Sequence, residues 1–261
     1  MKKALTILFN VLLIAGLVFF LSFSGSREKE LLCTEVRINM KDTLNAGFLK
    51  QKDIESTLVI EEAEILGYPI NDINIRSLEK KLLDNAYIRN AEIYSNLNGV
   101  LYVDVVQRRP VVRIITPGQR SYYLDREGYL FPEKAGFTPH VLIANGYFTE
   151  DNHLKKVRAI HELEENDDYR EWSDALELAT FIEGSEFWES QIVQIYRNSK
   201  GDFELVPRVG AHQIIFGDVS EMEKKFKKLK TLYEEGLKYE GWNKYEKINL
   251  KYNNQVICTK R

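Results

Sequence analysis

The hydrophobic pattern of the chain changes once, close to its start. Residues 4–23 form an almost unbroken apolar run with no charged side chain. About 20 such residues can cross the hydrocarbon core of a bilayer as one helix. Beyond residue 30, apolar positions recur at the alternating spacing of strands or at the spacing of amphipathic helices. The pattern therefore predicts one transmembrane helix followed by folded domains.

The first folded region has the pattern of a small α+β module in the order β-α-α-β-β. Its predicted elements are strands at residues 33–40, 88–94 and 100–106 and helices at residues 51–58 and 75–82. Asn74 stands at the N-cap of the second helix, where its side chain can accept a hydrogen bond from a free backbone amide. Asn98-Gly99 between two β-rich runs predicts a tight hairpin turn with positive φ at its central residues.

The second folded region has the pattern of a larger mixed α/β domain built on one sheet. Its predicted strands are at residues 111–116, 121–125, 129–131, 140–143, 191–197, 203–206, 213–216 and 247–258. Its predicted helices run through residues 154–160, 172–182 and 222–233. Ser220 and Glu223 have the spacing of a capping box and would open the last helix, whose Lys-rich run at 224–230 predicts a solvated face.

The junction between the two regions is predicted at Arg108-Arg109-Pro110. Pro110 interrupts an otherwise continuous β-rich run, because it has no amide hydrogen to donate and disfavours helix at Arg109. One sheet is expected to end before it and another to begin after it. The predicted domains are a cytoplasmic tail with the transmembrane helix at residues 1–24, a small domain at 25–109 and a larger domain at 110–261.

Composition narrows the classes of partner and leaves the state of the cysteines open. The 261 residues carry a formal net charge of −3, which argues against nucleic acid as a main partner, because phosphate neutralisation needs a basic face. Cys33 and Cys258 are far apart in the chain and form no CxxC pair. We expect buried or unpaired thiols, and a disulfide is the alternative if both residues lie outside the cytoplasm.

The N-terminal apolar run has two interpretations. An uncleaved anchor is favoured, because the run is longer than the ~7–15 apolar residues of a secretory signal peptide. A cleaved signal is the alternative, since Ser22 and Ser24 have the small-residue spacing of a cleavage site. Under both interpretations the folded regions lie outside the cytoplasm. We expect a single-pass protein of the cell inner (plasma) membrane with its N-terminus in the cytoplasm.

Four short stretches together resemble one bacterial family. They are Tyr-Ile-Arg-Asn-Ala-Glu-Ile at residues 87–93, Gln-Arg-Arg-Pro-Val-Val-Arg at 107–113, Tyr-Tyr-Leu-Asp-Arg-Glu-Gly at 122–128 and the closing strand at 248–256. Their order and spacing after one membrane anchor resemble the FtsQ (DivIB) family of cell-division proteins, and the first module resembles a POTRA domain. Gln107 departs from the pattern, because many members of that family carry an acid there.

No constellation of catalytic or metal-binding residues is recognisable in the sequence. The histidines do not have a metal-ligand spacing, and no nucleophile elbow or phosphate-binding glycine loop is present. The histidines are His140, His153, His161 and His212. The acidic residues between 164 and 168 lack the alternating ligands of an EF-hand. The sequence therefore predicts no enzyme, no cofactor and no small-molecule substrate.

A terminal strand at a sheet edge can pair with a strand of another protein, and the strand predicted at residues 247–258 is the candidate. Its predicted partner-binding residues are Ile248, Leu250, Tyr252, Asn254 and Val256. The resemblance implies a division-site scaffold with FtsB-like and FtsL-like partners and the septal synthase components FtsW and FtsI. It also places Tyr252 at the border of the FtsB surface. The alternatives are a POTRA-containing envelope translocation or chaperone component and a cell-envelope hydrolase.

Overall fold

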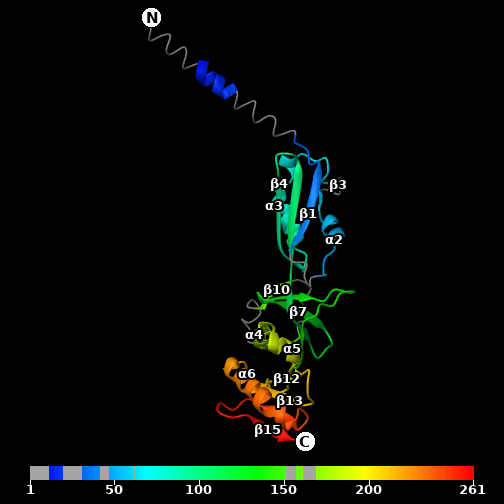
Figure 1. Ribbon diagram of the computed structural model, residues 1–261. Helices are drawn as coiled ribbons and strands as arrows, with labels where there is room; N and C mark the ends of the chain where they lie inside the picture. The colour runs from blue at the N-terminus through cyan, green and yellow to red at the C-terminus, as the bar shows by residue number, and fades with distance from the viewer. Residues whose placement is uncertain (1–11, 20–30, 42–46, 61–62, 151–156, 161–168) are drawn as a thin grey trace. The chain divides into compact units, whose positions relative to one another are not determined.

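The computed structural model of the protein describes residues 12–19, 31–41, 47–60, 63–150, 157–160 and 169–261. The chain forms two compact units (Figure 1). Among the described residues, the smaller unit extends to Gln107 and the larger unit runs from Arg108 to Arg261, with Gly47 also assigned to the larger unit. The fold is α+β, with a small mixed sheet in one unit and a large mixed sheet in the other. The domain boundary between residues 109 and 110 stays a prediction.

The predicted membrane segment lies largely outside the described residues. Residues 12–19 are helical. Among the helices in the described part of the chain, none is both long enough and apolar enough to cross a bilayer. The transmembrane helix over residues 4–23 therefore stays a prediction.

A three-stranded sheet forms the centre of the small unit. Its strands are β1 (Glu35–Lys41), β4 (Ile88–Ser95) and β5 (Val100–Gln107), in the order β1-β5-β4. The central strand β5 runs parallel to β1 and antiparallel to β4, with which it forms the predicted hairpin. A separate two-stranded ribbon, β2 (Val59–Ile60) and β3 (Ala63–Glu64), has no counterpart in the sequence-based prediction.

Short helices complete the small unit. They are α2 (Gln51–Glu55), the 3-10 helix η2 (Ile70–Asp72) and α3 (Ile75–Leu83). The Asn74 side chain accepts a hydrogen bond from the Ser77 amide at 3.0 Å, which confirms the predicted N-cap. Leu78 and Leu82 are the buried residues of α3, which packs along β4 (Figure 1). Helix α2 ends at Glu55, earlier than the sequence pattern predicts.

The hairpin between β4 and β5 differs from the predicted two-residue turn. Gly99 has a φ of 83°, whereas Asn98 is not in the positive-φ region. Asn96 closes the loop, because its Oδ1 accepts hydrogen bonds from the amides of Asn98 and Val100, both at 3.0 Å. The connection is therefore a longer loop that ends in one left-handed glycine, a common hairpin geometry.

A ten-stranded mixed sheet forms the centre of the larger unit. Its strands are β6 (Pro110–Ile115), β7 (Ser121–Asp125), β8 (Tyr129–Pro132), β9 (Leu142–Gly146), β10 (Arg158–Ala159), β11 (Ile192–Arg197), β12 (Phe203–Pro207), β13 (Gln213–Gly217), β14 (Tyr245–Asn249) and β15 (Ile257–Lys260). They follow the order β10-β8-β7-β6-β9-β11-β12-β13-β14-β15. The prediction of one sheet is confirmed, and β6, β7 and β8 form the predicted meander.

The helices of the larger unit pack against this sheet through one apolar core. They are α4 (Arg170–Glu183), α5 (Glu186–Gln191), α6 (Met222–Thr231), the π-helix η5 (Leu232–Leu237) and α7 (Lys238–Glu240). The core joins Trp172 of α4 and Phe226 of α6 to Ile214 and Ile248 of the sheet, all of which are buried. Because alternate residues of a strand share a face, this core covers one face of the sheet.

The helix predicted through residues 154–160 does not form where the structure describes that stretch. Arg158 and Ala159 belong to β10, which pairs antiparallel with β8. The apolar spacing is therefore misleading here, because a strand of two residues at a sheet edge needs no periodic pattern of its own. Residues 154–156 lie outside the described residues.

The predicted capping box at the start of α6 is also wrong. Glu221 occupies the N-cap with a left-handed φ of 51° and makes no side-chain cap. Ser220 instead donates its hydroxyl to Asp218 Oδ1 at 2.5 Å, so it is not available to the helix. Lys225 of α6 also bonds Asp218 Oδ1, at 2.8 Å, and this contact outweighs the local capping signal.

Candidate partner-binding edge strand

The sheet ends in a hairpin and not in the single strand predicted over residues 247–258. β14 ends at Asn249 and β15 begins at Ile257, and the chain reverses direction between them. β14 pairs in parallel with β13 on one side and antiparallel with β15 on the other. The prediction of one strand is wrong because Asn253-Asn254, two turn-forming residues, interrupt the β-prone run.

The five predicted partner-binding residues differ in their accessibility. The side chains of Ile248 and Leu250 are fully buried in the core, so they hold the hairpin in place and present no surface. Tyr252 is 47% exposed, and Asn254 is also exposed. Val256 is half-buried and packs against the core. Contact of a partner with these residues stays a prediction.

A lysine of α6 holds the loop of this hairpin, and Figure 1 shows α6 close to β12, β13 and β15. Lys228 Nζ donates to the carbonyl oxygens of Leu250 at 3.0 Å and Tyr252 at 2.5 Å. Burial lowers the pKa of Lys228. Lys251 of the same loop pairs with Asp202 at 2.7 Å, and this hydrogen-bonded ion pair raises the pKa of Lys251. The loop is therefore tied at two points before β15 begins.

β15 is the outermost strand of its sheet, so within the described residues one of its edges pairs with no other strand. The Arg261 amide donates inward to the Lys244 carbonyl at 3.3 Å. Because amides alternate sides along a strand, the Thr259 amide also faces β14, whereas those of Cys258 and Lys260 face away. Outward donors and acceptors of this kind are what an added strand pairs with.

Side chains of β15 also alternate between the two faces of the sheet. Cys258 packs against the apolar core, and Ile257, 42% exposed, belongs to the other face. Burial raises the pKa of the Cys258 thiol and, in the small unit, that of Cys33. Both cysteines carry free thiols in the structure, and the choice between unpaired thiols and a disulfide stays a prediction.

The predicted junction residues belong to the start of the larger unit. Arg108 is buried, and its Nη1 donates to Asp125 Oδ2 at 2.6 Å. Pro110 is the first residue of β6 and is buried opposite Asp125. Arg109 is exposed and lies 3.8 Å from a carboxylate oxygen of Glu183 in α4. A role of these three residues in orienting the two units stays a prediction.

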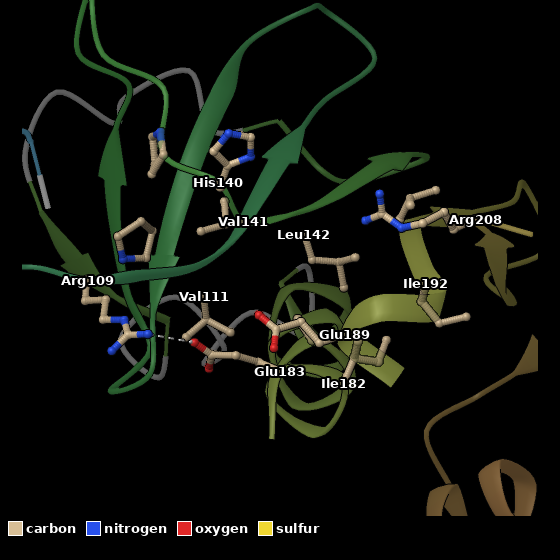
Figure 2. Close-up of a pocket in the computed structure, with 14 residues that line it drawn as sticks. Arg109, Val111, His140, Val141, Leu142, Ile182, Glu183, Glu189, Ile192 and Arg208 are labelled. Atoms are coloured by element: carbon tan, nitrogen blue, oxygen red, sulfur yellow. Dashed lines mark ion pairs between the residues drawn. The ribbon is translucent and has the colours of Figure 1, made fainter. Parts of the chain in front are cut away.

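A pocket of about 260 Å³ opens beside Arg109 in the larger unit. Apolar side chains from β6, β9, α4 and β11 form part of its wall, namely Val111, Leu142, Ile182 and Ile192 (Figure 2). Arg109 and Arg208 stand on opposite sides of it in Figure 2, and Glu183 and Glu189 also line it. Two guanidinium groups balance two carboxylates, so the pocket favours neither an anion nor a cation.

The two histidines within the described residues, His140 and His212, do not converge on one site. His140 lines the pocket, whereas His212 is buried with its Nε2 3.1 Å from the Tyr233 hydroxyl. Burial lowers the pKa of His212 and raises that of Tyr233. His153, His161 and the acidic residues between 164 and 168 lie outside the described residues. Among the residues that are described, no group of histidine, cysteine and acidic side chains could hold a metal ion.

Sequence reasoning missed the roles of Lys228, which holds the loop of the hairpin, and of Lys260, whose amide faces the open edge. The Lys-rich run of α6 indicates a solvated face, yet Lys228 reaches carbonyl groups 22 and 24 residues further along the chain. No local signal could have revealed that contact. The outward amide of Lys260 could have been found only from the register of β15 on β14.

Two family models match this chain. The model described as FtsQ/DivIB, C-terminal related, matches residues 109–259, which is more than half of the chain. The model described as a POTRA-like domain matches residues 31–106. A comparison with curated proteins gives no match.

Proposed function

The chain belongs to the FtsQ/DivIB, C-terminal related family, and from that membership we propose that it is a membrane-anchored, non-enzymatic scaffold of the bacterial cell-division machinery. The match confirms the family resemblance that the sequence motifs indicate, and the POTRA-like match agrees with it. Because one fold can serve many functions, the proposal depends on the surface that the larger unit offers to other chains.

The observation that carries the proposal is the unpaired edge of β15. A strand added there would gain main-chain hydrogen bonds, and side chains beside the edge would give specificity. Ile257, 42% exposed, is the first residue of this strand, and Tyr252, 47% exposed, lies in the loop that leads into it. Because β15 has only four residues, strand pairing alone gives few hydrogen bonds, and we expect such side-chain contacts to be necessary.

We expect the added strand to come from an FtsB-like or FtsL-like division protein, with FtsW/FtsI-type septal synthase components joined through the same assembly. The predicted anchor at residues 4–23 would confine the scaffold and its partners to the plasma membrane at the division site. Confinement to a plane raises the effective concentration of the partners, so a modest edge interaction suffices.

The test compares two substitutions of Lys260 in the full chain, co-produced with a tagged FtsB-like partner. Lys260→Pro removes the outward amide that an added strand would bond, while Lys260→Ala keeps that amide and removes only the charge. Loss of one hydrogen bond should reduce partner capture about tenfold for Lys260→Pro, with Lys260→Ala close to wild type. Equal capture by the two variants would refute the edge-strand assignment.

Tyr252→Glu gives a second measurement that leaves the backbone of the edge unchanged. The new carboxylate stands on an exposed side chain of the loop that leads into β15, so we expect weaker capture with an unchanged circular dichroism spectrum. If Tyr252→Glu and Lys260→Pro both capture the partner as wild type does, the binding surface lies elsewhere on the chain.

A further inference from the structure

Backbone hydrogen bonds tie three chain segments together at one end of the small unit. Residues 31–34 lie between residues 65–70 on one side and residues 96–99 on the other. The bonds are Cys33 N to Tyr68 O at 2.8 Å, Gly67 N to Cys33 O at 2.7 Å and Thr34 N to Gly99 O at 2.8 Å. β1 follows directly from the first segment, so the chain enters the small unit at this end. We call these three segments the leucine end.

Each segment of the leucine end exposes one leucine to solvent. Leu32 is 47% exposed, Leu66 is 53% exposed and Leu97 is 88% exposed. A single exposed leucine is ordinary on a protein surface and needs no explanation. Here three hydrogen-bonded segments at the same end of a small unit each expose a leucine. This grouping indicates a surface that contacts an apolar environment.

The leucine end also contains no charged residue, although 29% of the whole chain is charged. Its polar groups are the uncharged side chains of Cys33, Thr34, Tyr68, Asn96 and Asn98. The small unit has a natural comparison in Leu83, which is 45% exposed at the last turn of α3. Leu83 is flanked in sequence by two lysines and an aspartate, whereas no charged residue lies within four positions of Leu97, the most exposed leucine of the leucine end.

The sequence also limits how far the leucine end can be from the predicted anchor. Only residues 24–30 separate the apolar run at residues 4–23 from residue 31. Even fully extended, seven residues span at most about 25 Å. The headgroup layer on each side of the hydrocarbon core adds about 5–7 Å. The leucine end therefore lies within reach of the bilayer surface whenever the anchor is inserted.

We propose that the leucine end docks into the interfacial layer of the bilayer in which the chain is anchored. The proposal rests on the proposed membrane anchoring and adds a second contact, which the folded small unit makes. Its occupant is lipid: the leucines enter the boundary of the acyl chains, and Tyr68 and the asparagines face the headgroups. Because the leucine end is uncharged, a zwitterionic bilayer is sufficient and anionic lipid is not required.

Docking requires no refolding of the turn that carries the most exposed leucine. The Asn96 side chain accepts hydrogen bonds from two amides of the turn, which leaves Leu97 at its tip. At Gly99, a Cβ atom would lie 2.4 Å from the Leu32 carbonyl oxygen, so the turn sits directly on the segment that leads to the anchor. A rigid tip next to the tether would restrict rotation of the small unit at the membrane surface.

The test uses photocrosslinking in the full chain, reconstituted into phosphatidylcholine vesicles. Leu97→benzoylphenylalanine places a photoreactive group on the leucine end, and Leu83→benzoylphenylalanine is the matched control at a leucine outside it. Insertion of one leucine-sized side chain corresponds to about a tenfold change in partition. We therefore expect about tenfold more lipid adduct at position 97 than at position 83, measured by mass spectrometry of the protein.

A combined Leu32→Asp and Leu66→Asp variant separates docking from mere closeness to the tether. It should lower the lipid adduct at position 97 several-fold while circular dichroism stays unchanged. Equal amounts of lipid adduct at positions 97 and 83 would overturn the proposal. So would an amount at position 97 that the two aspartate substitutions leave unchanged, or crosslinking of position 97 to protein instead of lipid. A chain that fails to float with the vesicles would overturn both the anchoring and the docking. Flotation without the expected adduct overturns the docking alone.

Discussion

The buried ion pair at the start of the larger unit allows a quantitative prediction. Arg108 Nη1 donates to Asp125 Oδ2 at 2.6 Å, and the two side chains are only 9% and 1% exposed. Asp125 Oδ1 also accepts from the Tyr129 amide at 2.8 Å, and the guanidinium lies 4.5 Å from the centre of the Tyr129 ring. Asp125→Asn would remove the charge and leave that of Arg108 buried.

The expected cost follows from this burial. Removing one partner of a buried pair destabilises a protein by about 3–5 kcal/mol, because the remaining charge stays desolvated. Asparagine keeps the shape of aspartate and can still accept from the Tyr129 amide, so we expect the lower limit, about 3 kcal/mol. The matched control is Glu133→Gln, which breaks the pair between Arg113 and Glu133. Those side chains are 23% and 54% exposed, so its loss should cost about 1 kcal/mol or less.

Tryptophan fluorescence during urea unfolding can report this difference for the larger unit alone. All three tryptophans, Trp172, Trp188 and Trp242, belong to that unit. The free energy of unfolding of Asp125→Asn and Glu133→Gln is compared with wild type at pH 7. Equal small losses for both variants would refute the reasoning, because Arg108 would then reach water when its partner is removed. A double variant, Arg108→Met with Asp125→Leu, should regain most of the lost stability, since no charge then remains buried.

Two further predictions concern a glycine and a histidine. Gly99→Ala should destabilise the small unit by about 1–3 kcal/mol, because φ is +83° and the new Cβ would lie 2.4 Å from the Leu32 carbonyl oxygen; thermal unfolding of the small unit measures this. Stability of the larger unit should fall as the pH drops below about 6.5, by at most about 1.4 kcal/mol per pH unit for one proton. Burial lowers the pKa of His212, so below that pH the unfolded chain binds a proton that the folded chain resists. His212→Gln should flatten this dependence in urea titrations at pH 5.5 and 7.5, and an unchanged slope would assign it to other groups.

Local chemistry along the chain was sufficient for much of the fold. The alternation at residues 88–94 and 100–106 predicts β4 and β5, because a half-buried strand must alternate whichever strand it meets. Asn74 predicts the start of α3 because its side chain bonds an amide three residues away. The motifs that indicate the family are also short and local, and the matches to residues 31–106 and 109–259 confirm the family that they indicate.

Contacts between distant residues decided the candidate site and the leucine end. The pattern of residues 247–258 does not reveal that Ile248 is covered by strands on both sides while β15 forms the edge, because strand order is a property of the whole sheet. The sequence pattern predicts a solvated side chain for Lys228, whereas in the structure it bonds a carbonyl group of the C-terminal hairpin. Leu32, Leu66 and Leu97 are isolated leucines in the sequence, and backbone pairing among their segments brings them to one end of the small unit. Propensity and capping act within a few residues, whereas burial and edge position depend on which distant segments pair.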